Sequence, residues 1–282
     1  MAKQMEKMVI EPLPQSSRRD PTFKFKQRRA SGREVLKVGQ VPRLLGLLCQ
    51  AYPFIEIGVL FRPDKEGEPR YATEGWVRRL GEVVARSRGK MGLAAHLCGE
   101  RVNEVLRGDD AFVSTLPALG FRRVQINATA VNGVDTSSMA ASVPPVFDLM
   151  ARYPEIEFIL QKNEETEPLW RGILETGGDH GTLPENVTML LDESKGTGVM
   201  ASSWPNPPEG YDVGYAGGIG PANIKSILEI ISGKARGRAV WIDMESSLRS
   251  DKNGEDVFDT DKCIKCIEAV CDMKLFDHPD YL

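Results

Sequence analysis

The sequence predicts an α/β fold, a TIM (β/α)8 barrel, from two observations. Eight short apolar runs alternate with amphipathic helical patterns, and eight is the number of strands in a closed parallel barrel. A doubly wound open sheet would show the same alternation, but its first strand normally leads into a Gly-x-Gly-x-x-Gly fingerprint. Here the glycine loops fall late in the chain, where barrels of this type place a phosphate site.

The eight apolar runs are the predicted strands. They occupy residues 33–38, 54–61, 92–98, 121–128, 155–161, 187–192, 212–217 and 239–245. Between them, apolar residues recur at three- and four-residue spacing, which gives each predicted helix one buried stripe. The predicted helices cover residues 41–52, 74–87, 100–116, 143–153, 167–175, 221–232 and 259–273.

Residues 1–30 are expected to form a flexible basic tail, and residues 31–282 one barrel domain. The tail mixes Lys, Arg, Pro, Gln and Ser without apolar periodicity, so it cannot bury enough surface to offset the entropy of ordering. Its run FKFKQRR at 23–29 could contact an acidic partner, although a solvated arm is the simpler interpretation.

Charge and hydropathy exclude several classes of partner. A net charge of -4 and a pI near 5.6 argue against binding to nucleic acid or to an anionic membrane, because such binding usually needs a basic face. No stretch reaches the roughly 18 consecutive apolar residues of a membrane span, and no secretory signal begins the chain. We therefore expect a cytoplasmic protein that binds neither nucleic acid nor membrane, with its oligomeric state left open.

Several short motifs follow one another in a fixed order. They read LKVG at 36–39, IEIGVLF at 55–61, EPRY at 68–71, VQINA at 124–128, LLDESKGTG at 190–198, AGGIGPANI at 216–224 and IDMESSLRS at 242–250. Each motif is weak alone, but in this order the chain resembles the phosphoribosylanthranilate isomerase family of tryptophan biosynthesis. The resemblance covers about residues 36–273. It implies a barrel that acts on a phosphorylated sugar adduct.

The resemblance also implies an Amadori rearrangement, which opens an N-linked phosphoribosyl ring and yields a 1-deoxyribulose phosphate. It assigns the acid that protonates the ring oxygen to Asp192, whose carboxyl group can be partly desolvated at the end of a strand. The alternative for Asp192 is a loop cap, because Asp often bonds nearby backbone amides. The family's catalytic cysteine aligns with Val38, which cannot accept a proton.

The third predicted strand contains two residues that could replace the missing catalytic cysteine as the base. His96 and Cys98 lie two residues apart and so face the same side. Either could act as the base, with His better matched to neutral pH. The alternative is a packed histidine beside a small apolar thiol. Gln125, Asn127 and Lys162 are expected to line the mouth, and Asn127, where the family has His, suggests altered recognition.

Three late loops are predicted to bind a phosphate. Glycines and small side chains let an anion approach backbone amides, and Pro221 leaves the next helix N-terminus aimed at the same point. The expected phosphate-binding residues are Gly196, Thr197, Gly198, Gly217, Gly218, Ser246 and Ser247. The alternative is that these glycines only make tight turns. Glu245 would repel a phosphate unless it points away.

Two further features concern charge and metals. By resemblance, Arg70 in EPRY meets the anthranilate carboxylate, which an arginine can hold through two parallel hydrogen bonds; its alternative is a solvated loop charge.

Cys263, Cys266 and Cys271 share one predicted helix, and only His278 offers a fourth ligand, so helix packing is favoured over zinc. No Walker loop or nucleophile elbow is present. We expect neither a metal nor a cofactor.

Two functions stay open on this basis. The first is an isomerase-like enzyme that acts on a phosphorylated sugar adduct, with Asp192 as the acid. The second is a non-catalytic relative that keeps the phosphate site and binds a metabolite or a protein. Val38 and the basic tail favour the second hypothesis.

Overall fold

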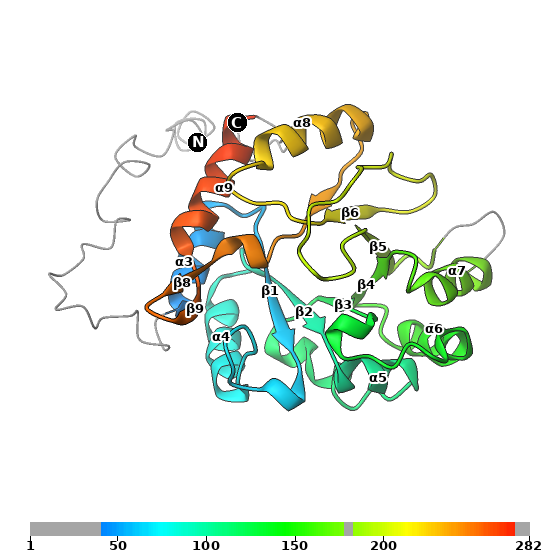
Figure 1. Ribbon diagram of the computed structural model, residues 1–282. Helices are drawn as coiled ribbons and strands as arrows, with labels where there is room; N and C mark the ends of the chain where they lie inside the picture. The colour runs from blue at the N-terminus through cyan, green and yellow to red at the C-terminus, as the bar shows by residue number, and fades with distance from the viewer. Residues whose placement is uncertain (1–40, 178–182, 274–282) are drawn as a thin grey trace, which may run out of the picture. The chain divides into compact units, whose positions relative to one another are not determined.

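The computed structural model describes residues 41–177 and 183–273, in which seven parallel strands curl into a half-barrel (Figure 1). The strand order follows the chain, and each strand pairs in parallel with the next. The strands are β1 Glu56–Phe61, β2 Gly92–Leu97, β3 Arg123–Ile126, β4 Glu157–Lys162, β5 Val187–Asp192, β6 Val213–Ala216 and β7 Trp241–Ile242.

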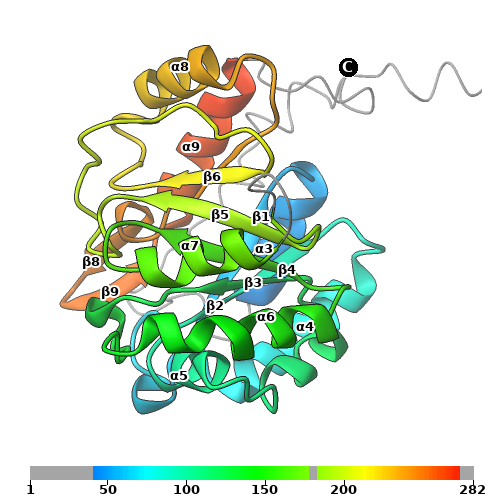
Figure 2. The same ribbon diagram turned by 90° about the vertical axis from the view of Figure 1, so that its right-hand side faces the viewer.

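Helices alternate with the strands and cover the outside of the sheet. They are α3 Val41–Ala51, α4 Glu74–Arg86, α5 Glu100–Leu106, α6 Val143–Arg152, α7 Glu167–Thr176, α8 Ile224–Ala235 and α9 Thr260–Asp272. Figure 2 shows α5, α6 and α7 side by side along one flank. Local signals set where they begin: the Thr73 hydroxyl accepts a hydrogen bond from Trp76 N at 3.3 Å, which caps α4.

The predicted α/β alternation is confirmed in the described ranges. Each predicted strand from 54–61 to 239–245 overlaps an observed strand, and β4 runs one residue beyond its predicted end. The predicted strand 33–38 and the predicted tail 1–30 lie outside the described residues. The predicted helix 100–116 was too long, because α5 ends at Leu106 and Gly108 then takes a left-handed φ of 76°. No helix in the described ranges has the length and apolar character to cross a bilayer.

An antiparallel hairpin after β7 was not predicted. It consists of β8 Arg249–Lys252 and β9 Glu255–Phe258. Its two turn residues, Asn253 and Gly254, have φ of 60° and 84°. Positive φ at both central residues is the geometry of a type I′ turn, for which Asn-Gly is the preferred pair.

The connection from β5 to β6 is a long loop rather than a helix. Trp204 lies in this loop and covers Tyr215 of β6, with ring centroids 6.1 Å apart in an edge-to-face arrangement. The Tyr215 hydroxyl donates to the Pro205 carbonyl oxygen at 2.7 Å, so the buried phenol has a partner. The loop therefore replaces a helix as the cover of β5 and β6.

Side chains on the concave face of the sheet form layers, because paired residues of parallel strands point to the same face. At the amino end, Arg123 donates to Glu56 at 2.9 Å and to Glu157 at 2.7 Å. Its guanidinium lies 4.5 Å from the Trp241 ring centroid. Burial raises the Glu56 pKa against the opposing effect of Arg123.

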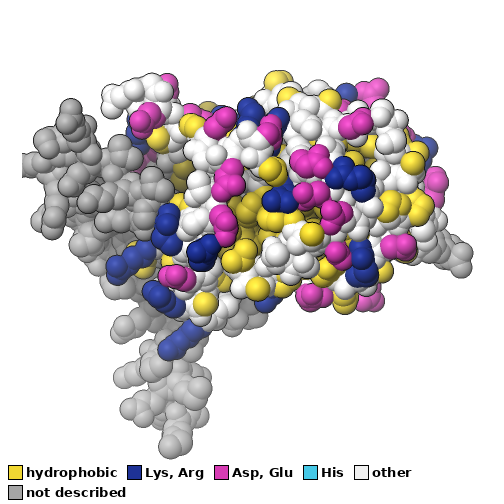
Figure 3. Space-filling view, turned by 90° about the horizontal axis from the view of Figure 1, so that it is seen from below, with side chains coloured by type: hydrophobic (Ala, Val, Ile, Leu, Met, Phe, Trp, Pro, Cys, Tyr) yellow, Lys and Arg dark blue, Asp and Glu magenta, His cyan; other side chains and the backbone are white. Residues whose placement is uncertain are grey.

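An apolar layer lies above this ion cluster. It consists of Ile159, Leu190 and Ala216, with Trp241 packed against them. Polar side chains return at the carboxyl end of the strands, where Gln161 and Asp192 are the inward residues. On the outer surface, the face in Figure 3 carries acidic and basic side chains interspersed around an apolar area.

Asn186 joins the end of α6 to the start of β5, and its removal should destabilise the fold. Its Nδ2 donates to the carbonyl oxygens of Met150, Tyr153 and Ile156 at 3.0, 3.2 and 3.1 Å. We expect Asn186→Ala to lower the free energy of unfolding in urea by about 1–3 kcal/mol, because these acceptors lose a donor. The matched control is Asn206→Ala at an exposed loop position, expected within about 0.5 kcal/mol of wild type. Equal losses in both variants would contradict the bridging role.

Candidate functional site

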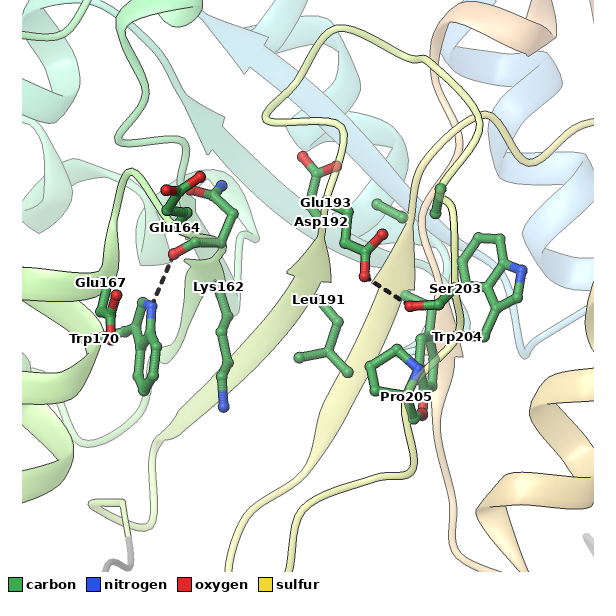
Figure 4. A pocket seen from close by; sticks show the side chains of 14 residues that line it. Lys162, Glu164, Glu167, Trp170, Leu191, Asp192, Glu193, Ser203, Trp204 and Pro205 are labelled. Carbon is green, nitrogen blue, oxygen red and sulfur yellow. Dashed lines mark hydrogen bonds between the residues drawn. The ribbon is translucent and has the colours of Figure 1, made fainter.

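A cavity of about 250 Å³ lies where β4, β5 and β6 end, between α7 and the loop that follows β5 (Figure 4). Parallel α/β sheets bind their ligands at this carboxyl end of the strands. The cavity wall combines aromatic rings with charged and amide groups. It includes Lys162, Asn163, Glu167, Trp170, Asp192, Glu193, Trp204 and Ala216.

Asp192 is 4% exposed at the tip of β5, and its carboxylate accepts four hydrogen bonds. Gln161 Nε2 donates at 2.6 Å, Ser194 donates from its amide at 3.0 Å and from its hydroxyl at 2.5 Å, and the Gly196 amide donates at 2.9 Å. Asp192 therefore does cap the glycine loop that follows it. The assignment of Asp192 as a catalytic acid stays a prediction.

Four residues predicted from the third and fourth apolar runs are brought together through Gln125. The Gln125 Nε2 lies 3.4 Å from His96 Nδ1, 3.0 Å from Asn127 Oδ1 and 3.3 Å from Asp243 Oδ2. Asn127 Nδ2 in turn contacts the Cys98 sulfur at 3.6 Å. The sequence interpretation missed Asp243, although a carboxylate at the end of an apolar run was the signal used for Asp192.

His96 and Cys98 differ as possible proton acceptors. Burial raises the Cys98 pKa to about 11, against a lowering by the Asn127 hydrogen bond, so this thiol stays protonated at neutral pH. His96 is partly buried, and its ring lies over Gly58, where an added Cβ would be 2.8 Å from His96 Nε2. Gly58 thus makes room for the imidazole, and His96 is the better candidate of the two.

The three predicted phosphate loops lie against one another. An added Cβ on Gly198 would be 3.4 Å from the Ser246 side chain, and one on Gly218 would be 2.7 Å from Met200 Cα. The Ser247 hydroxyl donates to the Ile219 carbonyl oxygen. Close packing therefore explains the glycine at position 218 whether or not an anion binds. This agrees with the alternative in which the glycines only make tight turns.

The backbone amides of these loops divide into two groups. Those of Gly196 and Thr197 donate within their own loop, to Asp192 at 2.9 Å and to the Ser194 carbonyl at 3.0 Å. Within the described parts of the chain, the amides of Gly198, Gly217, Gly218 and Ile219 donate to no protein group. A cluster of unpaired amides is the feature that attracts an anion.

Arg70 lies beside these loops and is held by carboxylates of its own chain. Its Nε donates to Asp256 at 2.8 Å, and one terminal nitrogen donates to Glu245 at 3.0 Å and to the Ser246 hydroxyl at 3.2 Å. Partial burial lowers the Arg70 pKa, but the Asp256 hydrogen bond and the Glu245 charge outweigh it and raise the pKa. Glu245 is thus paired with a cation, which offsets its repulsion of an anion.

Lys162 was expected to line the mouth, and its side chain lines the cavity from the helix side of the sheet. It is paired in register with the outward residue Leu191, and its Nζ donates to the Tyr211 hydroxyl at 2.8 Å. The same nitrogen lies 4.3 Å from the Trp170 ring centroid (Figure 4). Lys162 points to the opposite face from Gln161, the residue before it, because successive side chains of a strand point to opposite faces.

The cysteines of α9 are packing groups in the described residues. Cys263 and Cys266 are buried, and burial raises the pKa of each thiol to about 11. No group of three or more potential metal ligands gathers within residues 41–177 and 183–273. His278 lies outside these ranges.

The fold and the site together define a parallel α/β half-barrel with a polar cavity at the carboxyl ends of its strands. No protein-family model and no curated protein matches the chain. The resemblance to phosphoribosylanthranilate isomerases therefore rests on the order of the short motifs.

The Arg70 cluster should contribute stability that depends on pH. Partial burial raises the Asp256 pKa, but hydrogen bonds from Arg70 and Arg249 outweigh it and hold the pKa below the ordinary 3.8. A lowered native pKa stabilises the fold above 3.8, and this contribution disappears as the pH falls through the native value. Because Asp256 is about a third exposed, we expect Asp256→Asn to cost only about 0.5–1 kcal/mol at neutral pH.

Urea unfolding from neutral pH down to about pH 3 checks this expectation. The difference between wild type and Asp256→Asn should shrink toward the acidic end. Asp148→Asn is the matched control, because Asp148 is exposed and its side chain bonds no other described residue. A difference that grew on acidification would contradict the assignment.

Proposed function

We propose that the chain is a phosphoribosylanthranilate isomerase-like (β/α)8 barrel that binds a phosphorylated sugar adduct and isomerises it by Amadori chemistry. The observation that carries the proposal is the gathering of three late loops, whose unpaired amides lie next to a cavity that reaches Asp192. Ala216 lines this cavity and precedes Gly217 directly, so one small ligand can contact both.

The closed eight-stranded barrel is part of this proposal. Among the described residues, β1 and β7 are the edge strands of the sheet; the outer edge of β1 forms only a single bridge, between Leu60 and Tyr71, and β7 pairs only with β6. Unpaired edges of a curled parallel sheet are normally covered or closed. The predicted first strand, residues 33–38, lies outside the described residues.

In the proposed reaction, Asp192, which is a carboxylate in its resting form, first takes up a proton and then donates it to the sugar ring oxygen, while His96 removes the proton at C2. Cys98 is the weaker base because its raised pKa keeps the thiol protonated at neutral pH. The hydrogen bond network through Gln125 fixes the imidazole beside Asn127 and Asp243, which orients it on the concave face of the sheet.

A second candidate is a non-catalytic protein that binds a phosphorylated metabolite. Two observations favour it. Both oxygens of the Asp192 carboxylate are engaged by donors of the chain, and Arg70 is paired with Glu245 and Asp256. Groups that the isomerase family uses on its ligand are thus occupied within the protein.

Phosphate binding by the glycine loops is tested with a matched pair of variants at Gly198. The φ of 71° at this position is one that Asp and Asn tolerate, and an added Cβ meets only ordinary contacts. Gly198→Asp places a carboxylate among the amides, whereas Gly198→Asn places a neutral group of the same size there. By calorimetry, we expect ribose 5-phosphate to bind Gly198→Asp at least about tenfold more weakly than Gly198→Asn. Equal affinities would place the phosphate elsewhere.

Turnover of phosphoribosylanthranilate distinguishes the two candidate functions. If the isomerase proposal holds, His96→Asn should lower kcat by about 10²–10⁴-fold, because it removes the proton acceptor. Its affinity for inorganic phosphate should stay unchanged. Cys98→Ser is the control and should keep most of the activity. Wild-type protein that binds phosphate esters without any turnover would favour the non-catalytic candidate.

A further inference from the structure

Two of the buried side-chain polar atoms that have no partner in the described residues lie close together in the sequence. Within the described residues, three buried side-chain nitrogen or oxygen atoms make no hydrogen bond, namely Arg123 Nε, Gln161 Oε1 and Asn163 Nδ2. Arg123 belongs to the ion cluster at the amino end. The other two lie two residues apart at the carboxyl end of β4. Buried polar atoms are nearly always paired in folded proteins, so this pair requires a physical explanation.

The chemistry of the neighbours fixes which atom of each amide is unpaired. The Gln161 Nε2 faces the Asp192 carboxylate at 2.6 Å, and a carboxylate can only accept. The Asn163 Oδ1 faces the Thr166 backbone N–H at 3.1 Å, and this group can only donate. Neither amide can be turned round without losing its bond. The unpaired atoms are therefore an acceptor on Gln161 and a donor on Asn163.

Of the two amides, Asn163 lines the cavity directly and Gln161 adjoins it through Asp192, which also lines it. Gln161 is 3% exposed and Asp192 4%, so water does not satisfy them freely. The tip of β4 thus combines an unpaired acceptor, an unpaired donor and a carboxylate next to the loop that begins at Gly217.

We propose that Gln161 and Asn163 bind hydroxyl groups of the sugar portion of the ligand. A hydroxyl group both donates and accepts, so it can satisfy Gln161 Oε1 and Asn163 Nδ2. A phosphate oxygen, which only accepts, would be repelled by Gln161 Oε1 and Asp192. An alkyl group would leave both amide atoms unpaired.

This inference rests on the proposed function, in which the glycine loops bind the phosphate. It adds the groups that recognise the sugar portion and thereby select polyhydroxylated sugar phosphates over phosphate esters of simple alcohols. Gln161 and Asn163 are the specificity-determining residues.

Calorimetry with inorganic phosphate, ethyl phosphate and ribose 5-phosphate tests the inference. In wild type, ribose 5-phosphate should bind about tenfold or more tightly than ethyl phosphate, which corresponds to about 1.4 kcal/mol. Gln161→Met should abolish this preference while leaving the affinities for inorganic phosphate and ethyl phosphate unchanged. Gln50→Met, at an exposed position of α3, is the matched control and should behave as wild type.

A second variant keeps the test valid if Gln161→Met fails to fold. Asn163→Asp retains the oxygen that accepts from Thr166 and replaces only the donor, so it should also lose the preference for ribose 5-phosphate. Equal wild-type affinities for ribose 5-phosphate and ethyl phosphate would overturn the inference and leave phosphate binding intact. A uniform loss of all three ligands in both variants would mean a structural role and would also overturn it. Wild-type protein that binds none of the three would overturn the proposed function as well.

Discussion

The hydrogen bonds of the Asp192 carboxylate are the constraint on which the carboxyl end of the sheet depends. One carboxylate holds Gln161 of β4, the Ser194 turn and the Gly196 amide together. Because the loop is fixed at Gly196, Gly198 reaches the Ser246 side chain after β7. Strands that are not neighbours in the sheet are therefore connected through a single buried charge. Such a charge is stable inside a protein only when its lone pairs are satisfied, as they are here.

Other charges at the carboxyl end of the sheet are likewise neutralised by groups of the same chain. Arg70 has a φ of 84°, an uncommon value for a residue with a side chain, and it is held in this conformation by Asp256, Glu245 and Ser246. The unpredicted β8–β9 hairpin supplies Asp256. A ligand carboxylate that bound Arg70 would have to displace a protein carboxylate of equal charge. The resemblance alone could not have revealed this competition.

Much of the fold and part of the site could be predicted from periodicity. Period-two alternation predicted that His96 and Cys98 share one face, and in the structure Gln125 contacts His96 and Asn127 contacts Cys98. The Asn253-Gly254 turn carried a hairpin signal that was not used. By contrast, the partners of Arg70 are 175 and 186 residues away in the chain, and no local pattern encodes such a contact. The helix-side orientation of Lys162 was not predicted, because a strand boundary taken one residue short leaves the facing of its last side chain undecided.

Both ends of the sheet contain a buried polar atom without a partner, but in the described residues more unpaired groups lie at the carboxyl end, and this difference bears on function. At the amino end, the terminal nitrogens of Arg123 are bonded to Glu56 and Glu157 and the ring of Trp241 covers the guanidinium, which leaves only Arg123 Nε without a partner among the described side chains there. At the carboxyl end, an amide oxygen, an amide nitrogen and several backbone N–H groups have no partner within residues 41–177 and 183–273. Packing alone gives no reason for such an asymmetry, since unpaired groups cost free energy wherever they are buried. A ligand that supplies both hydroxyl groups and an anion would pair them, and it would do so at the end of the sheet where α/β proteins bind their ligands.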